Sequence, residues 1–325
     1  MPLLLSARAS TSSPIDLFTA AEGRALGLAL RTTDFIRVRH GVYARRVDYA
    51  SLSPWARYAA RVHAFALAHP DSVLCLESAA VAHGLPLFGE TREIHVQTEA
   101  PAKSARYGDV RVHSSVHART VVDIGTVRST SFVDTVVDLV RVLPPAQALA
   151  VVDAALSHVQ GGGAHALSDF TEACAARAGR RGAANAGWVW EHADGRSESP
   201  TESISRAVML WSGFETPELQ CEFRYEGQRD RVDFLFRSGA IVGEADGWSK
   251  YHLAKNTEAA ALLTEEKRRE DRLRRHGHPV ARWESRDAWH VTPLRQKLLA
   301  AGVPQSRPAS PAFLATLRHR TRRAL

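Results

Sequence analysis

Two acidic residues of this chain, Asp233 and Glu244, have a spacing that could bring their carboxylates together. Residues 232–236 are rich in aromatic and aliphatic side chains, which is typical of a β-strand, and 240–244 are expected to form the return strand. Ser238-Gly239 between them is typical of a tight two-residue hairpin turn. With the turn centred there, Asp233 lies opposite Glu244 on one face of the hairpin, with Cβ atoms roughly 5 Å apart.

Such a pair of carboxylates is unfavourable on its own, because like charges across a sheet repel each other and resist joint ionisation. A divalent cation between Asp233 and Glu244 would remove both objections. Carboxylate oxygens are the ligands of Mg²⁺, and of Mn²⁺ in the same role, with waters and substrate phosphate completing the shell. The alternative is that the acids are merely exposed, or that an arginine holds them, since Arg231 would face Asp246 in the same register.

Two residues that follow the pair could complete a set that cleaves phosphodiester bonds. Asp246 comes two residues after Glu244 and shares its face if the strand continues. Gly247 then allows the chain to turn, and Lys250 could bring an ammonium group to the same rim. Acids for a metal and a lysine for a phosphate or an attacking water are suited to metal-assisted hydrolysis.

These residues carry a resemblance to a known superfamily. Asp233, then the run from Glu244 to Lys250, then a basic helix and a last strand, resemble the PD-(D/E)XK nucleases, and most of all the group related to very-short-patch-repair endonucleases. The stretch 266–283 is similar to the helix, glycine and strand of that group. The resemblance implies a restriction-endonuclease-like α/β domain with a central mixed sheet at 190–300. One departure is that Asp246 replaces the lysine of the strict Glu-x-Lys motif, so activity would require Lys250 to take its place.

Glu202 has two interpretations that do not exclude each other. Ser199, Pro200 and Glu202 fit the N-cap, first and third positions of a helix with a capping box. In the nuclease superfamily a helix before the first strand often supplies a further acid to the metal, and the resemblance implies Glu202 for that role, with Glu198 less well placed. The predicted catalytic residues are Asp233, Glu244, Lys250, Glu202 and Asp246, of which Asp233, Glu244 and Glu202 would bind the metal.

Residues 15–52 are expected to form a winged helix, after a flexible leader at 1–14. Asp16–Leu30 has helical composition, 31–35 is a second short helix or a turn, and 36–45 alternates apolar and basic residues around His40-Gly41. That pattern predicts a hairpin with its arginines on one face, which would contact DNA phosphates. A winged helix that binds protein instead of DNA is the alternative. The predicted DNA contacts here are Arg37, Arg39 and Arg45.

Residues 1–170 resemble the AbiEi-type antitoxins of type IV toxin–antitoxin systems. The resemblance rests on Gly41-Val-Tyr43, on Ser78–Pro86 and on a helix at Ser131–Val140 that contains Asp134 and Asp138. It implies a small α/β domain at 53–185, repression of the chain's own operon through the winged helix, and a toxin protein as partner.

The middle of the chain alternates predicted strands and helices. Residues 93–97, 110–113 and 121–124 are expected to be short strands, on which His95 and His113 would face solvent rather than bind a metal. Residues 130–143, 145–158 and 167–178 have the apolar spacing of helices. A small, basic stretch after 178 places the domain boundary at about 180–195.

The charge and composition of the whole chain favour a polyanionic partner. The 325 residues are 45% hydrophobic and 24% charged, with a net charge of +7, although general solubility is an alternative reason for that charge. A helix at 258–276 mixes basic and acidic residues, and Lys267 and Arg268 on it could hold phosphates. An Arg-rich tail follows at 301–325.

Cysteine use and hydropathy bear on the compartment. Cys75, Cys174 and Cys221 are scattered, with no CxxC pair, which fits a reducing cytoplasm. No window approaches the ~20 apolar residues of a membrane span, and Met1–Ser6 lacks the basic start and the apolar length of a signal peptide.

Three functions are consistent with the sequence. The first is a DNA-binding protein with a Mg²⁺-dependent endonuclease domain. The second is an AbiEi-type antitoxin-like transcriptional regulator whose nuclease-like domain is catalytically inactive, which the substitution of Asp246 for lysine would favour. The third is a protein-interaction adaptor, against which the basic charge of the chain and its tail argue.

Overall fold

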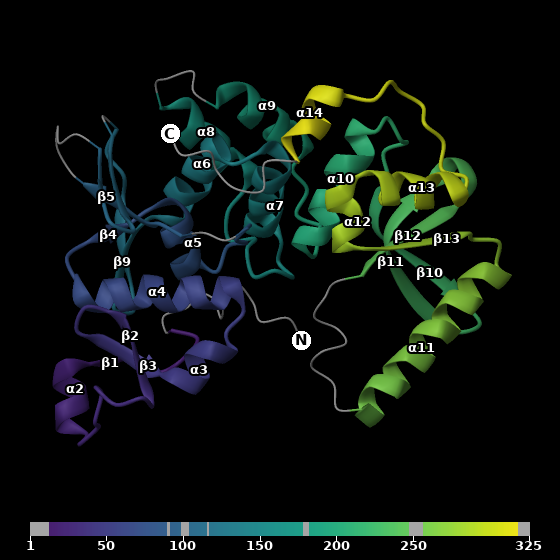
Figure 1. The fold of residues 1–325 in the computed structure, drawn as a ribbon. Coiled ribbons are helices and arrows are strands. Elements are labelled where there is room, and N and C mark those ends of the chain that lie inside the picture. The colour runs from purple at the N-terminus through teal and green to yellow at the C-terminus, as the bar shows by residue number, and fades with distance from the viewer. Residues whose placement is uncertain are drawn as a thin grey trace. The chain divides into compact units, whose positions relative to one another are not determined.

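A computed structural model describes residues 13–89, 92–98, 104–115, 117–177, 182–246 and 256–317, with the side chains of residues 184 and 256–263 excepted. The chain divides into two units, each described by itself below (Figure 1). Unit 1 contains the chain up to residue 143 and residues 158–187, and unit 2 contains 144–157 and 188–319. Both are mixtures of helices and sheet. Within the described ranges no helix is long and apolar enough to cross a membrane.

Unit 1 begins with a small three-stranded sheet in the order β1-β3-β2. Its elements are β1 (Phe18–Thr19), α2 (Ala20–Ala25), β2 (Phe35–Arg39), β3 (Val42–Arg45) and α3 (Arg46–Ser51). The predicted hairpin is confirmed as β2 and β3, but the helix predicted over Asp16–Leu30 is reduced to α2. Phe18-Thr19 pairs with the hairpin instead, and Gly27 with φ of +65° ends the helix.

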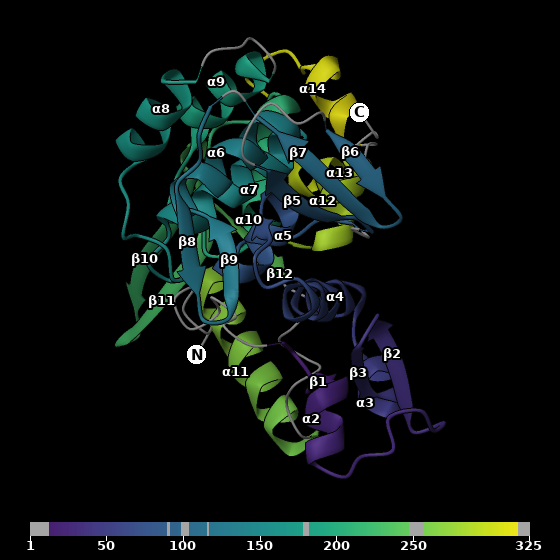
Figure 2. The same cartoon turned by 90° about the vertical axis from the view of Figure 1, so that its left-hand side faces the viewer.

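The helix α4 (Pro54–Ala68) packs against this small sheet and also against the larger sheet of the unit (Figures 1 and 2). Ser53 caps its first turn, since the Ala56 N–H donates to the Ser53 Oγ at 3.3 Å. The core between α4 and the large sheet contains Tyr58, Val62, Phe65 and Ile94. The position of the hairpin is therefore fixed by α4.

The larger sheet has six strands in the order β6-β7-β5-β4-β9-β8 and mixes parallel with antiparallel pairs. The strands predicted near 93–97, 110–113 and 121–124 are confirmed as β5, β7 and β8. Helix α5 (Leu76–His83) ends at Gly84, which has φ of +69°. The strands are β4 (Val73–Leu74), β5 (Ile94–Thr98), β6 (Ala105–Tyr107), β7 (Val110–Ser114), β8 (Val121–Ile124) and β9 (Val127–Thr130), with helices α5 (Leu76–His83), α6 (Phe132–Val142) and α8 (Leu167–Ala175).

Unit 2 is built on a four-stranded mixed sheet in the order β10-β11-β12-β13. The first three strands pair antiparallel, and β12 pairs parallel with β13 after the crossover helix α11. The sheet contains β10 (Glu218–Tyr225), β11 (Gln228–Phe236), β12 (Ile241–Asp246) and β13 (Val280–Glu284), and the helices are α7 (Pro145–Leu156), α10 (Pro200–Trp211), α11 (Asn256–Arg275), α12 (Ser285–His290), α13 (Thr292–Ala300) and α14 (Pro311–Thr316). Helix α9 (Ala183–His192) contains the boundary between the two units, after residue 187.

The middle strands of this sheet are covered on both faces. Phe234, Leu235 and Phe236 are consecutive on β11 and all buried, which is why the sequence there is continuously apolar rather than alternating. Leu273 of α11 packs with Leu235 and Val242. Trp283 of β13 donates from its Nε1 to the Ser205 Oγ of α10 at 2.8 Å.

Helix α7 belongs to unit 2, although the sequence placed residues 145–158 with the N-terminal half. The carboxylate of Asp153 on α7 is fully buried and lies 2.7 Å from the Arg206 guanidinium of α10. The Asp194 N–H donates to the same carboxylate at 2.8 Å. A buried charge requires a buried partner, and that partner comes from unit 2.

Candidate active site

The hairpin of β11 and β12 has the predicted register. Phe234 pairs with Gly243 and Leu235 with Val242, and Asp233 and Glu244 are the next residues beyond the last pair of this ladder. The predicted two-residue turn is wrong, because residues 237–239 form a 3₁₀ turn followed by Ala240 with φ of +48°. The register is unchanged because this longer connection is centred on the same point.

Local packing fixes both acids at the end of this ladder. The Ala245 N–H donates to the Asp233 carboxylate at 2.8 Å, which orients that side chain. Gly243 has no side chain where the Trp283 ring packs, and a Cβ there would lie 2.7 Å from the ring. The backbone beside Glu244 can therefore approach β13 closely.

Glu244 is a buried carboxylate whose charge is only partly compensated. Its side chain is 8% exposed, and its Oε1 lies 3.0 Å from the Arg269 Nη2 of α11, without the geometry of a hydrogen bond. Burial, and then the charge of Asp233, raise the pKa of Glu244 to about 7, with Arg269 and Arg282 opposing the rise. The carboxyl is thus poised to take up a proton or a cation near neutral pH.

Glu202 lies at the start of α10, and Ser199 is the N-cap as predicted, but the predicted capping box is incomplete: the Glu202 Oε2 accepts from the Glu198 N–H at 2.8 Å rather than from the N–H of the N-cap. The Glu202 N–H donates to the Ser199 Oγ at 3.2 Å, and the Glu202 Oε1 accepts from that hydroxyl at 2.7 Å. Gln220 of β10 donates to the Glu202 Oε2 at 3.0 Å. Burial, followed by the charge of Asp233, raises the pKa of Glu202 to about 8.

The two glutamates are therefore linked electrostatically through Asp233, whose negative charge raises the pKa of each. Three carboxyls from α10, β11 and β12 share one electrostatic environment. Among the residues that the structure describes, however, no group of three or more His, Cys, Asp and Glu side chains is arranged to hold a metal ion. A metal site here would use Asp233 and Glu244 as a pair of ligands. The Glu202 carboxylate is occupied by its hydrogen bonds at the start of α10.

The structure describes one of the predicted site residues Asp246 and Lys250 but not the other. Asp246 lies at the end of β12, and its carboxylate is 3.4 Å from the Arg282 Nε of β13. Arg231, the partner expected from the register, instead pairs with Glu198 at 2.6 Å, so that expectation is wrong. Lys250 lies outside the described residues, and its predicted role stays a prediction.

The basic residues of α11 mostly hold the helix on the sheet. Arg272 pairs with Asp230 at 2.6 Å and Arg275 with Glu226 at 2.8 Å, both acids of the β10–β11 hairpin. Lys267 is exposed, and Arg268 is exposed and pairs only within the helix, with Glu265 at 2.8 Å. Both predicted phosphate contacts of α11 are therefore exposed, as are Arg274 and Arg275, which pair with Glu270 and Glu226.

Comparison with known proteins identifies relatives of the chain, but their names give no activity. The chain is 32% identical over 220 residues to the uncharacterized protein Rv2248 of Mycobacterium tuberculosis strain H37Rv, covering 67% of this chain and 76% of the relative. The uncharacterized protein MT2308 of strain CDC 1551 matches equally, at 32% over 220 residues. The chain belongs to the family of these mycobacterial proteins. No family model matches the chain, and no solved structure matches it.

In this family member the arginines of the β2–β3 hairpin do not share one face. A bulge between Arg37 and Arg39 shifts the register, so Arg39 joins the face of Ile36, Val42 and Ala44. Arg39 then pairs with Asp109 at 2.8 Å and lies over the Phe65 ring of α4 at 4.9 Å. Arg37 and Arg45 remain exposed on the other face.

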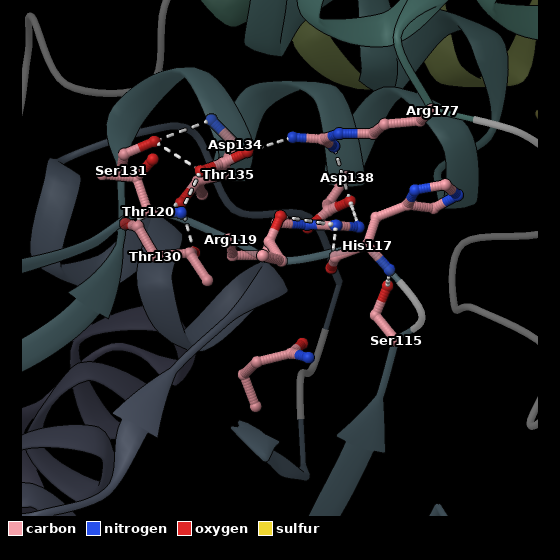
Figure 3. Close-up of polar contacts among 12 residues, drawn as sticks. Ser115, His117, Arg119, Thr120, Thr130, Ser131, Asp134, Thr135, Asp138 and Arg177 are labelled. Carbon is pink, nitrogen blue, oxygen red and sulfur yellow. Dashed lines mark hydrogen bonds and ion pairs between the residues drawn. The ribbon is translucent and has the colours of Figure 1, made fainter. Parts of the chain in front are cut away.

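The aspartates of α6 form an ionic network that explains their presence structurally (Figure 3). Arg119 donates two hydrogen bonds of 2.9 Å to the Asp138 carboxylate. Arg177, which follows α8, pairs with Asp138 at 2.8 Å and also with Asp134. Both arginines are largely buried, so Asp134 and Asp138 anchor the segment before β8 and the end of α8 to α6.

A histidine pair on β5 and β7 also differs from expectation. His95 is buried, at 3% exposed, so its predicted solvent-facing position is wrong. The Nδ1 of His95 lies 2.9 Å from the Nε2 of His113, and its Nε2 lies 3.5 Å from the Glu77 carboxylate. The prediction failed because α5 covers this face of the sheet, which a two-residue alternation does not reveal.

The sequence did not single out Arg269 or Arg282 as site residues. Arg282 pairs with Glu266 of α11 and lies 3.5 Å from Glu270, and it opposes Glu244 in the β12–β13 register. The signal that could have found Arg269 is its three-residue spacing from Arg272 on a helix, which puts both on one face.

Proposed function

We propose that the chain is a divalent-metal-dependent nuclease that hydrolyses phosphodiester bonds of DNA, with its active site in unit 2. The observation that carries the proposal is that Asp233 and Glu244 directly follow the last pair of the β11–β12 ladder and that the charge of Asp233 acts on both glutamates, which with burial raises the pKa of Glu244 to about 7 and that of Glu202 to about 8. The order of the sheet, with a helix before it and a parallel crossover through α11, supports the restriction-endonuclease-like fold that the sequence resemblance implies.

The residues present fit Mg²⁺ or Mn²⁺. Mg²⁺ is usually held by one or two carboxylates and keeps several of its waters, so Asp233 and Glu244 are sufficient protein ligands. The buried Glu244 Oε1 accepts no well-formed hydrogen bond, although the Arg269 Nη2 lies 3.0 Å away, and such an atom is costly unless something else compensates it. A hard cation would compensate it directly.

In the proposed reaction, a metal bound here would lower the pKa of a bound water and stabilise charge that develops on the phosphate. Asp233, oriented by the Ala245 N–H, and Glu244 would hold it. With its pKa raised to about 8, Glu202 holds a proton at neutral pH and stays neutral beside the pair. Asp246, close to Arg282, would act through water, and Lys250 keeps its predicted role of positioning the attacking water.

Incubation of purified protein with supercoiled plasmid and with single-stranded DNA, in Mg²⁺ or Mn²⁺, tests this function. We expect nicking or linearisation by the wild type and loss of it in Asp233→Asn, whereas Glu226→Gln, an exposed acid on the β10–β11 turn, should retain activity. If the wild type leaves both DNA substrates intact in either metal, the nuclease assignment is wrong.

A second candidate function is DNA-binding transcriptional regulation of the AbiEi antitoxin type, with a toxin protein as partner. The observation that favours it is the exposure of Arg37 and Arg45 on one face of the β2–β3 hairpin. A footprint on the promoter of the chain's own operon, lost in Arg37→Ala/Arg45→Ala, would support it. Since Cys75, Cys174 and Cys221 form no disulfide, we keep a reducing cytoplasm as the proposed compartment.

A further inference from the structure

Arg269 differs from its neighbours on α11 in the acid that it contacts. Arg272 and Arg275 pair with Asp230 and Glu226, which have no part in the proposed chemistry. Arg269 reaches Glu244, a proposed metal ligand, and its Nη2 lies 3.0 Å from the Glu244 Oε1. Its Nη1 donates to the Arg231 carbonyl at 2.7 Å. The guanidinium thus lies at the oxygen where a divalent cation would bind.

This ion pair is close but poorly formed. The Glu244 Oε1 accepts no hydrogen bond of acceptable geometry, so the contact lacks the directional part that makes arginine–carboxylate pairs strong. The Arg272–Asp230 pair, by contrast, has two hydrogen bonds of 2.7 and 2.6 Å. Arg269 is also 25% exposed on its side chain, against 15% for Arg272, so it can leave its acid with less rearrangement.

We propose that Arg269 exchanges between two partners: Glu244 when no divalent cation is bound, and a DNA phosphate when one is. A cation on Glu244 satisfies the carboxylate and repels the guanidinium. The released guanidinium stays at the rim of the site, because Arg272 and Arg275 keep α11 on the sheet. A planar guanidinium suits a phosphate. This inference rests on the proposed function, since it requires the metal to bind at Glu244.

Two binding measurements test the exchange. Mn²⁺ affinity is measured without DNA, by electron paramagnetic resonance at pH 8, for the wild type, Arg269→Ala, Arg274→Ala and Glu244→Gln. Arg274 is the matched control, because it is exposed and pairs with Glu270 of its own helix at 2.8 Å. Affinity for a short fluorescent DNA duplex is then measured with the cation present, under conditions too brief for cleavage. Thermal melts confirm that each variant is folded.

The exchange predicts opposite effects of one substitution. Arg269→Ala should bind Mn²⁺ roughly tenfold more tightly, because a partly buried competing charge is removed, and should bind the duplex more weakly, with a salt slope lower by about 1. Arg274→Ala should leave Mn²⁺ affinity unchanged, and Glu244→Gln should abolish Mn²⁺ binding.

Unchanged Mn²⁺ affinity or unchanged duplex affinity in Arg269→Ala would overturn the exchange while leaving the metal site standing. A wild type and an Arg269→Ala variant that both fail to bind Mn²⁺ would overturn the proposed function, and the exchange with it.

Discussion

Glu202 and Glu244 are held in a state that opposes stability at neutral pH. Burial and the charge of Asp233 raise the pKa of Glu244 to about 7 and that of Glu202 to about 8, from an ordinary value of 4.5. A carboxyl with a raised folded-state pKa binds its proton more tightly in the folded state. The contribution of each carboxyl to folding stability is therefore fully present below pH 4.5. It is lost as the pH rises through about 7 for Glu244 and through about 8 for Glu202.

Glu244→Gln should consequently stabilise unit 2 at pH 8 by about 2 kcal/mol and have little effect at pH 4.5. Every tryptophan except Trp55 lies beyond residue 187, so urea unfolding followed by tryptophan fluorescence reports on unit 2. Asp271→Asn, at an exposed position of α11, serves as the control. Equal effects of Glu244→Gln at the two pH values would contradict the proposed burial of charge.

His63 of α4 should make unit 1 sensitive to acid. It is 4% exposed, and burial lowers its pKa to about 4, from an ordinary 6.5. The unfolded chain then binds the extra proton first, so stability falls as the pH decreases from 6.5 toward 4. Replacing His63 with Leu should remove about 2 kcal/mol of this loss, measured by circular dichroism, whereas His40→Gln, in an exposed position, should leave the pH dependence as it is.

Helix α7 illustrates how an element can belong to a unit from which its sequence position separates it. Its buried polar side chains, among its described residues, are Gln147 and the charged Asp153, and the 2.7 Å contact of Asp153 with Arg206 ties α7 to α10. Removing one member of a buried pair leaves the other charge uncompensated. Helix α7 is thus part of the support beneath α10, which carries Glu202.

Asp153→Ala should destabilise unit 2 by about 3 kcal/mol. The tryptophan-monitored transition should shift, whereas Asp169→Ala, an acid on α8 of unit 1, should leave that transition in place. A shift of equal size in the two variants would show that α7 does not support unit 2 through this pair.

Local signals predicted a good part of the candidate site. The hairpin register followed from the apolar strands around 238–239, and the start of α10 followed from Ser199, Pro200 and Glu202. The contact of Arg269 with Glu244 and the role of α7 could not be foreseen, because each depends on residues far apart in sequence: 25 positions for Arg269 and Glu244, and 53 for Asp153 and Arg206. The bulge after Arg37 does not show in the alternating sequence pattern. Arg39 was therefore predicted on the wrong face of the hairpin.

Across the whole chain, the net charge of +7 overstates the basic surface available to DNA. Many arginines are committed internally: Arg39 and Arg61 to Asp109, Arg119 and Arg177 to the acids of α6, and Arg272 to Asp230. Of the residues predicted to contact DNA, Arg37 and Arg45 in unit 1 and Lys267 and Arg268 in unit 2 are exposed. DNA affinity should therefore depend on a few residues rather than on overall charge.

Arg37→Ala/Arg45→Ala should lower the affinity for duplex DNA and reduce the slope of log affinity against log salt by about 2, measured by fluorescence anisotropy. Arg39→Ala should instead lower stability, because Asp109 and the Phe65 ring lose a partner. If Arg39→Ala weakens DNA binding as much as the double variant while remaining equally stable, the assignment of the hairpin faces is wrong.

The central claim is that Asp233 and Glu244 jointly hold a divalent cation, and locating Mn²⁺ in crystals tests it most directly. Anomalous scattering from crystals soaked in MnCl₂ should give a peak about 2.1 Å from a carboxylate oxygen of each residue, and no such peak in Asp233→Asn crystals. A Mn²⁺ peak bound elsewhere, or none at all with Arg269 still on Glu244, would contradict the account.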